Sequence, residues 1–170
     1  MSSDKHPAKL RYTTFQFPGY RYIPFQNMPH PRNDPAGHSF GQEEEYLPEF
    51  KPEDWSTCVP YLYGVDLFNH GYWWEAHEAW ESVWIAAARK SRTGIFVQGL
   101  IQIAAAQLKR FMKEYRGAEI LTQDGCNKLQ LAEPVFLGID VKGLTDEAQY
   151  LLETDSADFP VIDLKIMSAQ

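Results

Sequence analysis

The sequence contains little of what marks secreted or membrane proteins. It has only two cysteines, Cys58 and Cys126, and neither lies in a recognisable motif. Residues 1–7 lack the apolar segment of a signal peptide. The longest uncharged, largely apolar stretch, residues 95–108, contains three glutamines and is too short to cross a bilayer. We therefore expect a soluble cytoplasmic protein with reduced thiols.

Basic clusters, glycine-rich phosphate loops and recognisable serine or cysteine nucleophile motifs are absent as well. The formal net charge is −7, and no stretch is rich in Lys or Arg. This charge argues against nucleic acid or an anionic membrane surface as the main partner. The expected partner is a small molecule or another protein, which the sequence does not identify. An oligomer is also possible.

Proline is nearly absent from the last two thirds of the chain, since nine of the eleven prolines lie at or before Pro60. The first third therefore cannot form long helices. It carries many aromatic residues, more than a solvated linker would: Tyr12, Phe15, Phe17, Tyr20, Tyr22, Phe25, Phe40 and Tyr46. We predict that residues 1–55 form an extended arm packed on the core, with about the first eight residues free. Residues 56–170 would then form the helical part of one structural domain.

Helical patterns begin after Val59. We predict helices over residues 61–69, 72–88, 93–113 and 115–131, a shorter helix after Thr145, and an extended tail over residues 158–164 that docks on the bundle. The expected fold is all-α, an antiparallel bundle of four to five helices built from αα-hairpins and wrapped by the proline- and aromatic-rich arm.

The second predicted helix carries a polar pair within an apolar stripe. On a helical wheel centred on His77, the side chains within about 80° include Glu81 and a set of large apolar residues: Trp73, Trp74, Trp80, Trp84, Ile85 and Ala88. Glu75 and Glu78 fall on the opposite, solvent side. His77 and Glu81 are four residues apart, so their side chains can meet. The wheel predicts a buried His77–Glu81 pair in a pocket with Trp80 and Trp84.

The third predicted helix can complete this pocket. Gln98 and Gln102 share one of its faces, and Gly99 would let another backbone come close. If the second and third helices pack as a hairpin, either glutamine could reach the His77–Glu81 pair and extend a polar network.

The spacing His77-x-x-x-Glu81-x-x-Trp84, followed by the segment from Gln98 to Gln102 and three alanines, resembles domain-of-unknown-function family 309. The resemblance covers about residues 60–131, and the arm segment 29–39 looks like an extension found in some members. It implies a small helical protein of the bacterial and archaeal kind. It assigns no function, although the His/Glu motif of the family has been suggested to bind metal.

Three interpretations of the pair stay open. In the first, His77 and Glu81 form a structural polar network. In the second, they bind a divalent metal such as Zn, Mn or Fe, with further ligands from the arm: His30, Asp34 and His38. In the third, His77 is a catalytic base oriented by Glu81. Without a metal, no cofactor is expected.

The corresponding functions are of different classes. A metal site with His77 and Glu81 as catalytic residues would make the chain a metal-dependent, hydrolase-like enzyme. A structural network at the same two residues would make it a non-catalytic interaction or assembly module, for which the proline-rich arm would be the binding segment.

Overall fold

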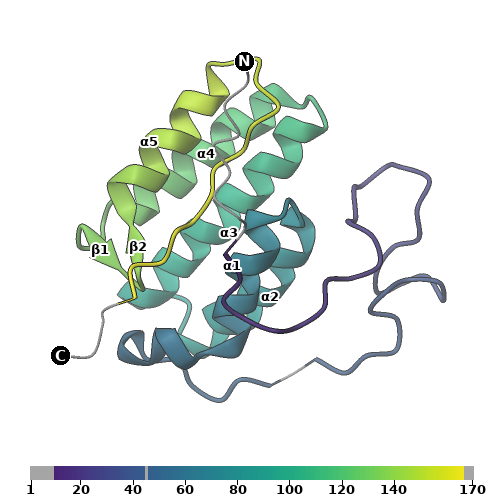
Figure 1. Cartoon of the computed structure of the whole chain (residues 1–170), viewed down its shortest axis with the longest axis horizontal. Coiled ribbons are helices and arrows are strands. Elements are labelled where there is room, and N and C mark those ends of the chain that lie inside the picture. Colours follow the sequence, from purple (N-terminus) through teal and green to yellow (C-terminus); the bar gives the residue numbers. More distant parts are fainter. Residues whose placement is uncertain (1–9, 45, 167–170) are drawn as a thin grey trace.

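Six helices and one small hairpin make up the fold of the computed structural model, which describes residues 10–44 and 46–166. The predicted freedom of the first eight residues lies outside these ranges. The elements in chain order are the 3₁₀ helix η1 (Pro52–Thr57), α1 (Val59–Asn69), α2 (Trp73–Ala86), α3 (Arg92–Phe111), α4 (Tyr115–Leu129), β1 (Val135–Phe136), β2 (Ile139–Asp140) and α5 (Val141–Leu152). The all-α prediction is confirmed (Figure 1).

Helices α1 to α4 form where their sequence patterns predict them. Pro60 lies in the first turn of α1, where its missing N–H leaves no helical bond unmade. Ser91 caps α3 by accepting a hydrogen bond from the backbone N–H of Gly94 at 2.9 Å. In the described part of the chain, no helix is both long and apolar enough to span a membrane.

The segment after α4 differs from the prediction. β1 and β2 pair antiparallel around a tight turn, in which Leu137 and Gly138 both have positive φ. Helix α5 begins at Val141 rather than after Thr145, because the side chain of Asp140 caps it by accepting from the N–H of Gly143 at 3.1 Å. The sequence pattern also missed η1, which precedes α1.

Short connections make consecutive helices pack against one another, α1 on α2, α2 on α3 and α3 on α4. Trp80 is fully buried at the centre, where its indole N–H donates to the carbonyl of Tyr61 at 3.1 Å. Gly99 permits the close approach that was predicted, since a Cβ there would lie 3.0 Å from the carbonyl oxygen of Gly125.

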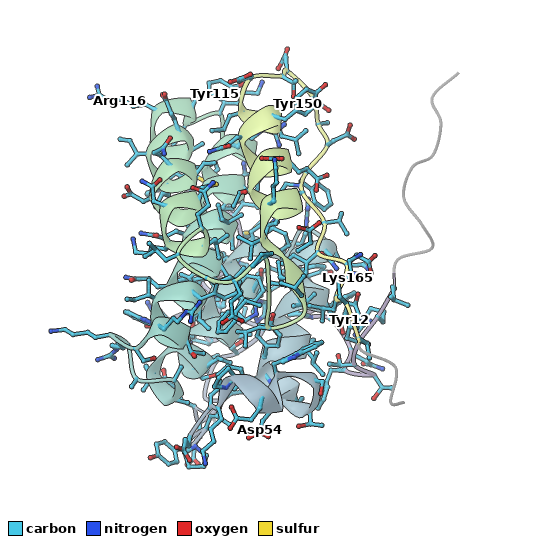
Figure 2. All side chains as sticks on the ribbon, turned by 90° about the vertical axis from the view of Figure 1, so that its left-hand side faces the viewer. Tyr12, Asp54, Tyr115, Arg116, Tyr150 and Lys165 are labelled. Carbon is cyan, nitrogen blue, oxygen red and sulfur yellow. The ribbon has the colours of Figure 1, made fainter. Side chains whose placement is uncertain are left out.

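Two irregular segments, the arm and the tail, lie against the helices. The tail after α5 runs back across the bundle to the β1–β2 hairpin (Figure 1), where the N–H of Lys165 donates to the carbonyl of Gly138 at 2.7 Å. Asn69 of α1 both donates to and accepts from the backbone of Ile162, at 2.8 and 2.7 Å. The N–H of Leu164 donates to the hydroxyl of Tyr12 at 2.8 Å, so the start of the arm meets the tail beside Lys165 (Figure 2). The predicted docking of the tail is confirmed.

Replacing Gly64 by alanine should strongly destabilise the fold. Gly64 lies under Trp80, and a Cβ there would overlap the indole ring. We expect a loss of roughly 1–3 kcal/mol in the free energy of unfolding, as is typical of overpacked cores. Gly117→Ala in α4 is the matched control, because its Cβ would meet only the flexible side chain of Lys109 at 3.5 Å or more. The control should be neutral or stabilising by up to about 1 kcal/mol, and urea denaturation of both variants measures the difference.

Candidate functional site

The buried stripe of α2 is rotated relative to the predicted one. It is formed by Trp73, Ala76, Trp80, Val83 and, just past the helix, Ala87. On the helical wheel its centre lies about 80° away from His77. The prediction that His77 and Glu81 are buried is therefore wrong, since both are half-buried at the edge of the stripe.

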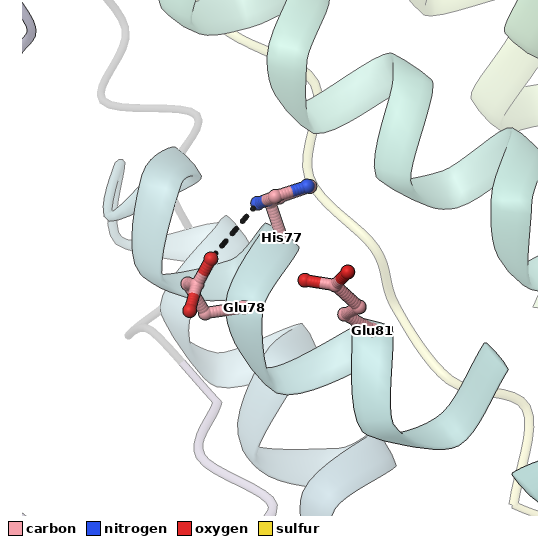
Figure 3. Close-up of side chains that lie close together, drawn as sticks. All are labelled: His77, Glu78 and Glu81. Carbon is pink, nitrogen blue, oxygen red and sulfur yellow. Dashed lines mark ion pairs between the residues drawn. The ribbon is translucent and has the colours of Figure 1, made fainter. Parts of the chain in front are cut away.

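Three donor groups converge at this edge of α2. His77, Glu78 and Glu81 can each offer one ligand atom, and these atoms all lie within 4.8 Å of one another. His77 Nδ1 lies 3.5 Å from Glu78 Oε1, while the carboxylate of Glu81 comes from the next helical turn (Figure 3). The side chain of Glu81 makes no ion pair or hydrogen bond within the described residues. Among those residues, these three form the one group of His, Cys, Asp and Glu side chains placed to hold a metal.

The other residues predicted for the pocket divide into two groups. Trp80 belongs to the core and not to a pocket wall. Trp84, Gln98 and Gln102 are half-buried, and no hydrogen bond joins either glutamine to His77 or Glu81 in residues 10–44 and 46–166. The predicted network is therefore not formed.

Two polar atoms of that half-buried group are nevertheless left unsatisfied. The indole nitrogen of Trp84 and the Oε1 atom of Gln102 are both buried without a hydrogen-bond partner among the described residues. Such atoms are uncommon in folded proteins, because each loses the hydrogen bonds that water would have made.

The buried carboxylate of α2 is Glu75, which the wheel had placed in solvent. Its side chain is only 4% exposed, because the arm covers it. Glu75 Oε1 accepts from the backbone N–H of Tyr22 at 2.8 Å and lies 3.0 Å from His38 Nε2, whereas its Oε2 has no partner within the described residues. Burial raises the pKa of Glu75, although the hydrogen bonds from Tyr22 and His38 act to lower it.

The neighbouring acid Glu78 also faces the arm. Arg32 donates from Nε to Glu78 Oε2 at 2.8 Å, which leaves the other oxygen toward His77. Burial acts to raise the pKa of Glu78, but the hydrogen bonds from His77 and Arg32 outweigh it and the pKa is lowered. Glu78 is therefore held as a carboxylate, with the guanidinium of Arg32 on one side and the imidazole of His77 on the other.

The arm residues that were predicted as metal ligands lie elsewhere. His30 packs edge-on against Trp74 and Tyr22, with ring centroids 5.7 and 5.1 Å apart. Asp34 closes a turn by accepting from the N–H of Ala36 at 2.9 Å. His38 is bound to Glu75. The arm thus packs on the face of α2 that holds Glu75 and Trp74, and it does not bring these three side chains to the His77, Glu78 and Glu81 cluster.

The aromatic side chains of the arm pack only in part as predicted. Phe17 stacks on Tyr72, with ring centroids 5.0 Å apart, and Tyr22 packs on Trp74. In contrast, Phe25 is 93% exposed and Tyr46 is 84% exposed. The rings anchor the first part of the arm and the segment around His38, but not the loop that contains Phe25.

The fold and the cluster on α2 together define a small helical-bundle protein with a half-buried polar site. Residues 61–121 match the family described as "Domain of unknown function (DUF309)". The family predicted from the helix motifs is thereby confirmed. No curated protein matches the chain. The arm and α5 lie outside the matched residues.

Sequence reasoning missed two buried acids that hold the arm, Glu75 and Asp66. Asp66 is fully buried in α1 and accepts from the backbone N–H groups of Tyr12 and Thr13 at 2.8 and 2.9 Å. A wheel identifies the helix face that other helices cover, whereas these two acids are buried by irregular backbone. A single sequence carries no periodic signal for that kind of contact.

The buried carboxyl of Glu75 should make stability depend on pH. Because its pKa is raised in the folded state, the folded protein retains a proton that the unfolded chain has already lost. Its contribution is therefore present below the ordinary pKa of a glutamate and is lost as the pH rises through the raised pKa. Relative to Glu75→Gln, which does not titrate, the wild type should lose unfolding free energy from about pH 4 upward.

Urea denaturation of both proteins between about pH 4 and 7 measures this difference. Glu119→Gln, at an exposed position on α4, is the control and should follow the wild type at every pH. A difference between wild type and Glu75→Gln that stays constant or grows with pH would contradict the assignment.

Proposed function

We propose that the chain binds a divalent metal ion, such as Zn, Mn or Fe, through His77, Glu78 and Glu81. The observation that carries the proposal is the convergence of one imidazole and two carboxylates within 4.8 Å on the edge of α2. This set replaces the one expected from the sequence, since Glu78 takes the place of His30, Asp34 and His38.

The residues present fit such an ion. Imidazole nitrogen and carboxylate oxygen are donors that Zn, Mn and Fe accept. Arg32 fixes the orientation of Glu78, as a charged neighbour does for many ligating carboxylates. The carboxylate of Glu81 has no competing cation in the described residues. Since ligand atoms of one ion lie about 3 Å apart, side-chain rotations have to close the cluster slightly.

Half-burial gives this site an open side. His77 is 36% exposed at its side chain and Glu78 is 22% exposed, so three protein ligands would leave positions for water or substrate. A bound ion would supply Lewis acidity and an activated water, which is the basis for a hydrolytic activity. The three side chains would hold the ion at the surface of α2, next to the cleft that Glu78 and Glu81 help to line.

A purely structural role for His77 and Glu81 has less support. A structural network requires buried, mutually bonded groups, whereas these two are half-buried and no hydrogen bond joins them. The buried carboxylate that bonds two segments together is Glu75 instead.

Metal analysis tests the proposal directly. Protein purified without a nickel column should contain, or take up in a titration with Zn²⁺ or Mn²⁺, about one equivalent of metal. His77→Ala and Glu81→Gln should each weaken binding by about tenfold or more, because each removes one of three ligands. Glu119→Gln should bind as the wild type does. Wild-type protein that is metal-free and takes up neither ion in calorimetry would overturn the proposal.

Glu81→Gln also separates the metal site from a structural network. In metal-free protein, this substitution should change the free energy of unfolding by less than about 0.5 kcal/mol, as at most positions without buried partners. Breaking a buried ion pair would instead lose about 3–5 kcal/mol. Urea midpoints of wild type and variant in EDTA decide between the two.

A further inference from the structure

A cleft of about 730 Å³ lies between the arm and the helices α1 and α2. The arm segment 29–39, which looked like a family extension in the sequence, forms part of its wall through Arg32, His38 and Ser39. The larger apolar residues lining it include Phe15, Phe17, Leu47, Tyr63, Leu67 and Trp74. A cleft of this size and lining suits a small organic molecule with an apolar part.

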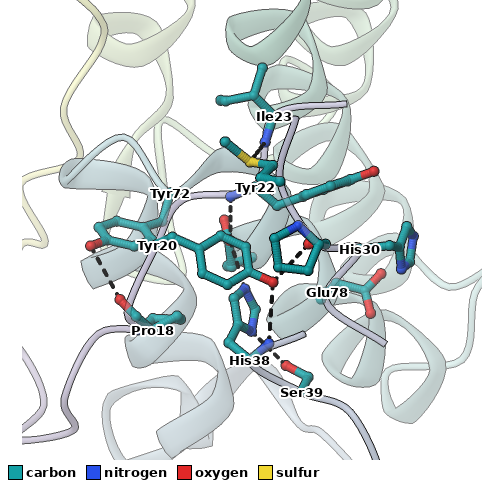
Figure 4. Close-up of polar contacts among 12 residues, drawn as sticks. Pro18, Tyr20, Tyr22, Ile23, His30, His38, Ser39, Tyr72 and Glu78 are labelled. Carbon is teal, nitrogen blue, oxygen red and sulfur yellow. Dashed lines mark hydrogen bonds and ion pairs between the residues drawn. The ribbon is translucent and has the colours of Figure 1, made fainter. Parts of the chain in front are cut away.

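Three side chains that line this cleft are joined by hydrogen bonds. The hydroxyl of Ser39 lies 2.8 Å from His38 Nδ1 (Figure 4). On the other side of the ring, His38 Nε2 lies 3.0 Å from Glu75 Oε1. A hydroxyl, an imidazole and a buried carboxylate in this order are the parts of an activated nucleophile. The ring presents Nδ1 to the hydroxyl and Nε2 to the carboxylate, and either ring nitrogen of a histidine can act as the base.

The surroundings fix the tautomer of His38. Glu75 is an acceptor when ionised, so it holds the proton of the imidazole on Nε2. The lone pair of Nδ1 then points to the hydroxyl of Ser39, which donates to it. The ring packs against Tyr20 and Trp74, with centroids 4.7 and 6.4 Å apart, and is only 10% exposed. His38 is therefore held in one orientation as a base for Ser39.

The backbone of the arm holds Ser39 in place as well. Its N–H donates to the carbonyl of Pro31 at 3.0 Å, and the N–H of His38 donates to the hydroxyl of Tyr20 at 3.2 Å. Gly37 allows the loop to close, because a Cβ there would overlap the carbonyls of His30 and Pro31. These backbone contacts hold the loop, and with it Ser39, in one conformation.

We propose that Ser39 is the nucleophile of an acyl-transfer site that takes carboxylic esters with an apolar acyl group. Ser39 Oγ bonds to the ester carbonyl carbon while its proton passes to His38 Nδ1. The bond from that carbon to the alcohol oxygen then breaks, and His38 returns the proton to the leaving alcohol. Water repeats the two steps, which releases the carboxylic acid and restores Ser39.

Glu75 and Arg32 have separate roles in this site. Glu75 is a positioning residue, since it acts through His38. Arg32 is the one Lys or Arg among the described residues lining the cleft, and it is already paired with Glu78 at 2.8 Å and with Glu44 at 3.4 Å. An N–H group of its guanidinium that these two pairs leave over would donate to the oxyanion that forms on the carbonyl. This inference does not depend on a metal at His77, Glu78 and Glu81.

Labelling with an alkyl fluorophosphonate tests the nucleophile. Full-length protein treated with the probe should gain one adduct by intact mass spectrometry, and peptide mapping should place it on Ser39. Ser39→Ala should remove the adduct. Ser82→Ala is the matched control, because Ser82 lines the same cleft but donates to the carbonyl of Ala79 and has no histidine partner among the described residues. It should label as the wild type does.

Two further variants test the roles of the neighbours. His38→Gln should slow labelling by about a hundredfold, because it removes the base. Glu75→Gln should lower the maximal labelling rate and leave the probe concentration for half-maximal rate unchanged. Loss of the cleft would instead raise that probe concentration. Hydrolysis of p-nitrophenyl butyrate should follow the same order of variants and should persist in EDTA.

The comparison of Ser39→Ala with Ser82→Ala decides the proposal even if a variant of His38 or Glu75 fails to fold. Wild-type protein that forms no adduct, or an adduct that Ser39→Ala retains, would overturn it. Loss of both labelling and ester hydrolysis in EDTA would also overturn it, because the chemistry would then belong to the metal site.

Discussion

The backbone of an irregular segment has to find hydrogen-bond acceptors when it is buried, and in this protein two carboxylates provide them. Asp66 of α1 accepts from the N–H groups of Tyr12 and Thr13, and Glu75 of α2 accepts from that of Tyr22. No described residue of the arm pairs with a strand, so these carboxylates accept hydrogen bonds that a neighbouring strand would otherwise accept. The cleft exists because they hold the arm against α1 and α2.

This arrangement divides the acids of α2 between two tasks. Glu75 is bonded to the arm and, through His38, becomes part of the cleft. Glu78 has one oxygen toward Arg32 of the arm and the other toward His77, so it links the cleft to the cluster that includes Glu81. A helix with carboxylates at positions i, i+3 and i+6 therefore presents acid groups to two neighbouring environments.

The helices and their order could be predicted from apolar periodicity and from the positions of proline and glycine, which act locally. The orientation of α2 about its axis could not be predicted. The predicted buried stripe was centred on His77 because it included Trp74 and Trp84. Both are half-buried, and Trp74 packs on arm residues such as Tyr22. A large aromatic residue indicates that its position is buried, but it does not indicate whether a helix or an irregular segment covers it.

Only those site residues that lie on one helix could be predicted from the sequence. His77 and Glu81 were found because they are four residues apart on one helix. The contact of His38 with Glu75 joins an irregular loop to a helix, and no spacing in the sequence indicates it. The hairpin before α5 was missed because its strands have only two residues each.

The bond between the N–H of Leu164 and the hydroxyl of Tyr12 joins residues 152 positions apart. The contacts of α1 to α4, in contrast, join neighbours along the chain. Because the entropy lost on closing a loop increases with its length, local contacts form more readily than distant ones. The helical bundle would therefore assemble first, and the arm and the tail would close over it in a late step of folding. The cleft, whose wall is the arm, would be among the last features of the molecule to form.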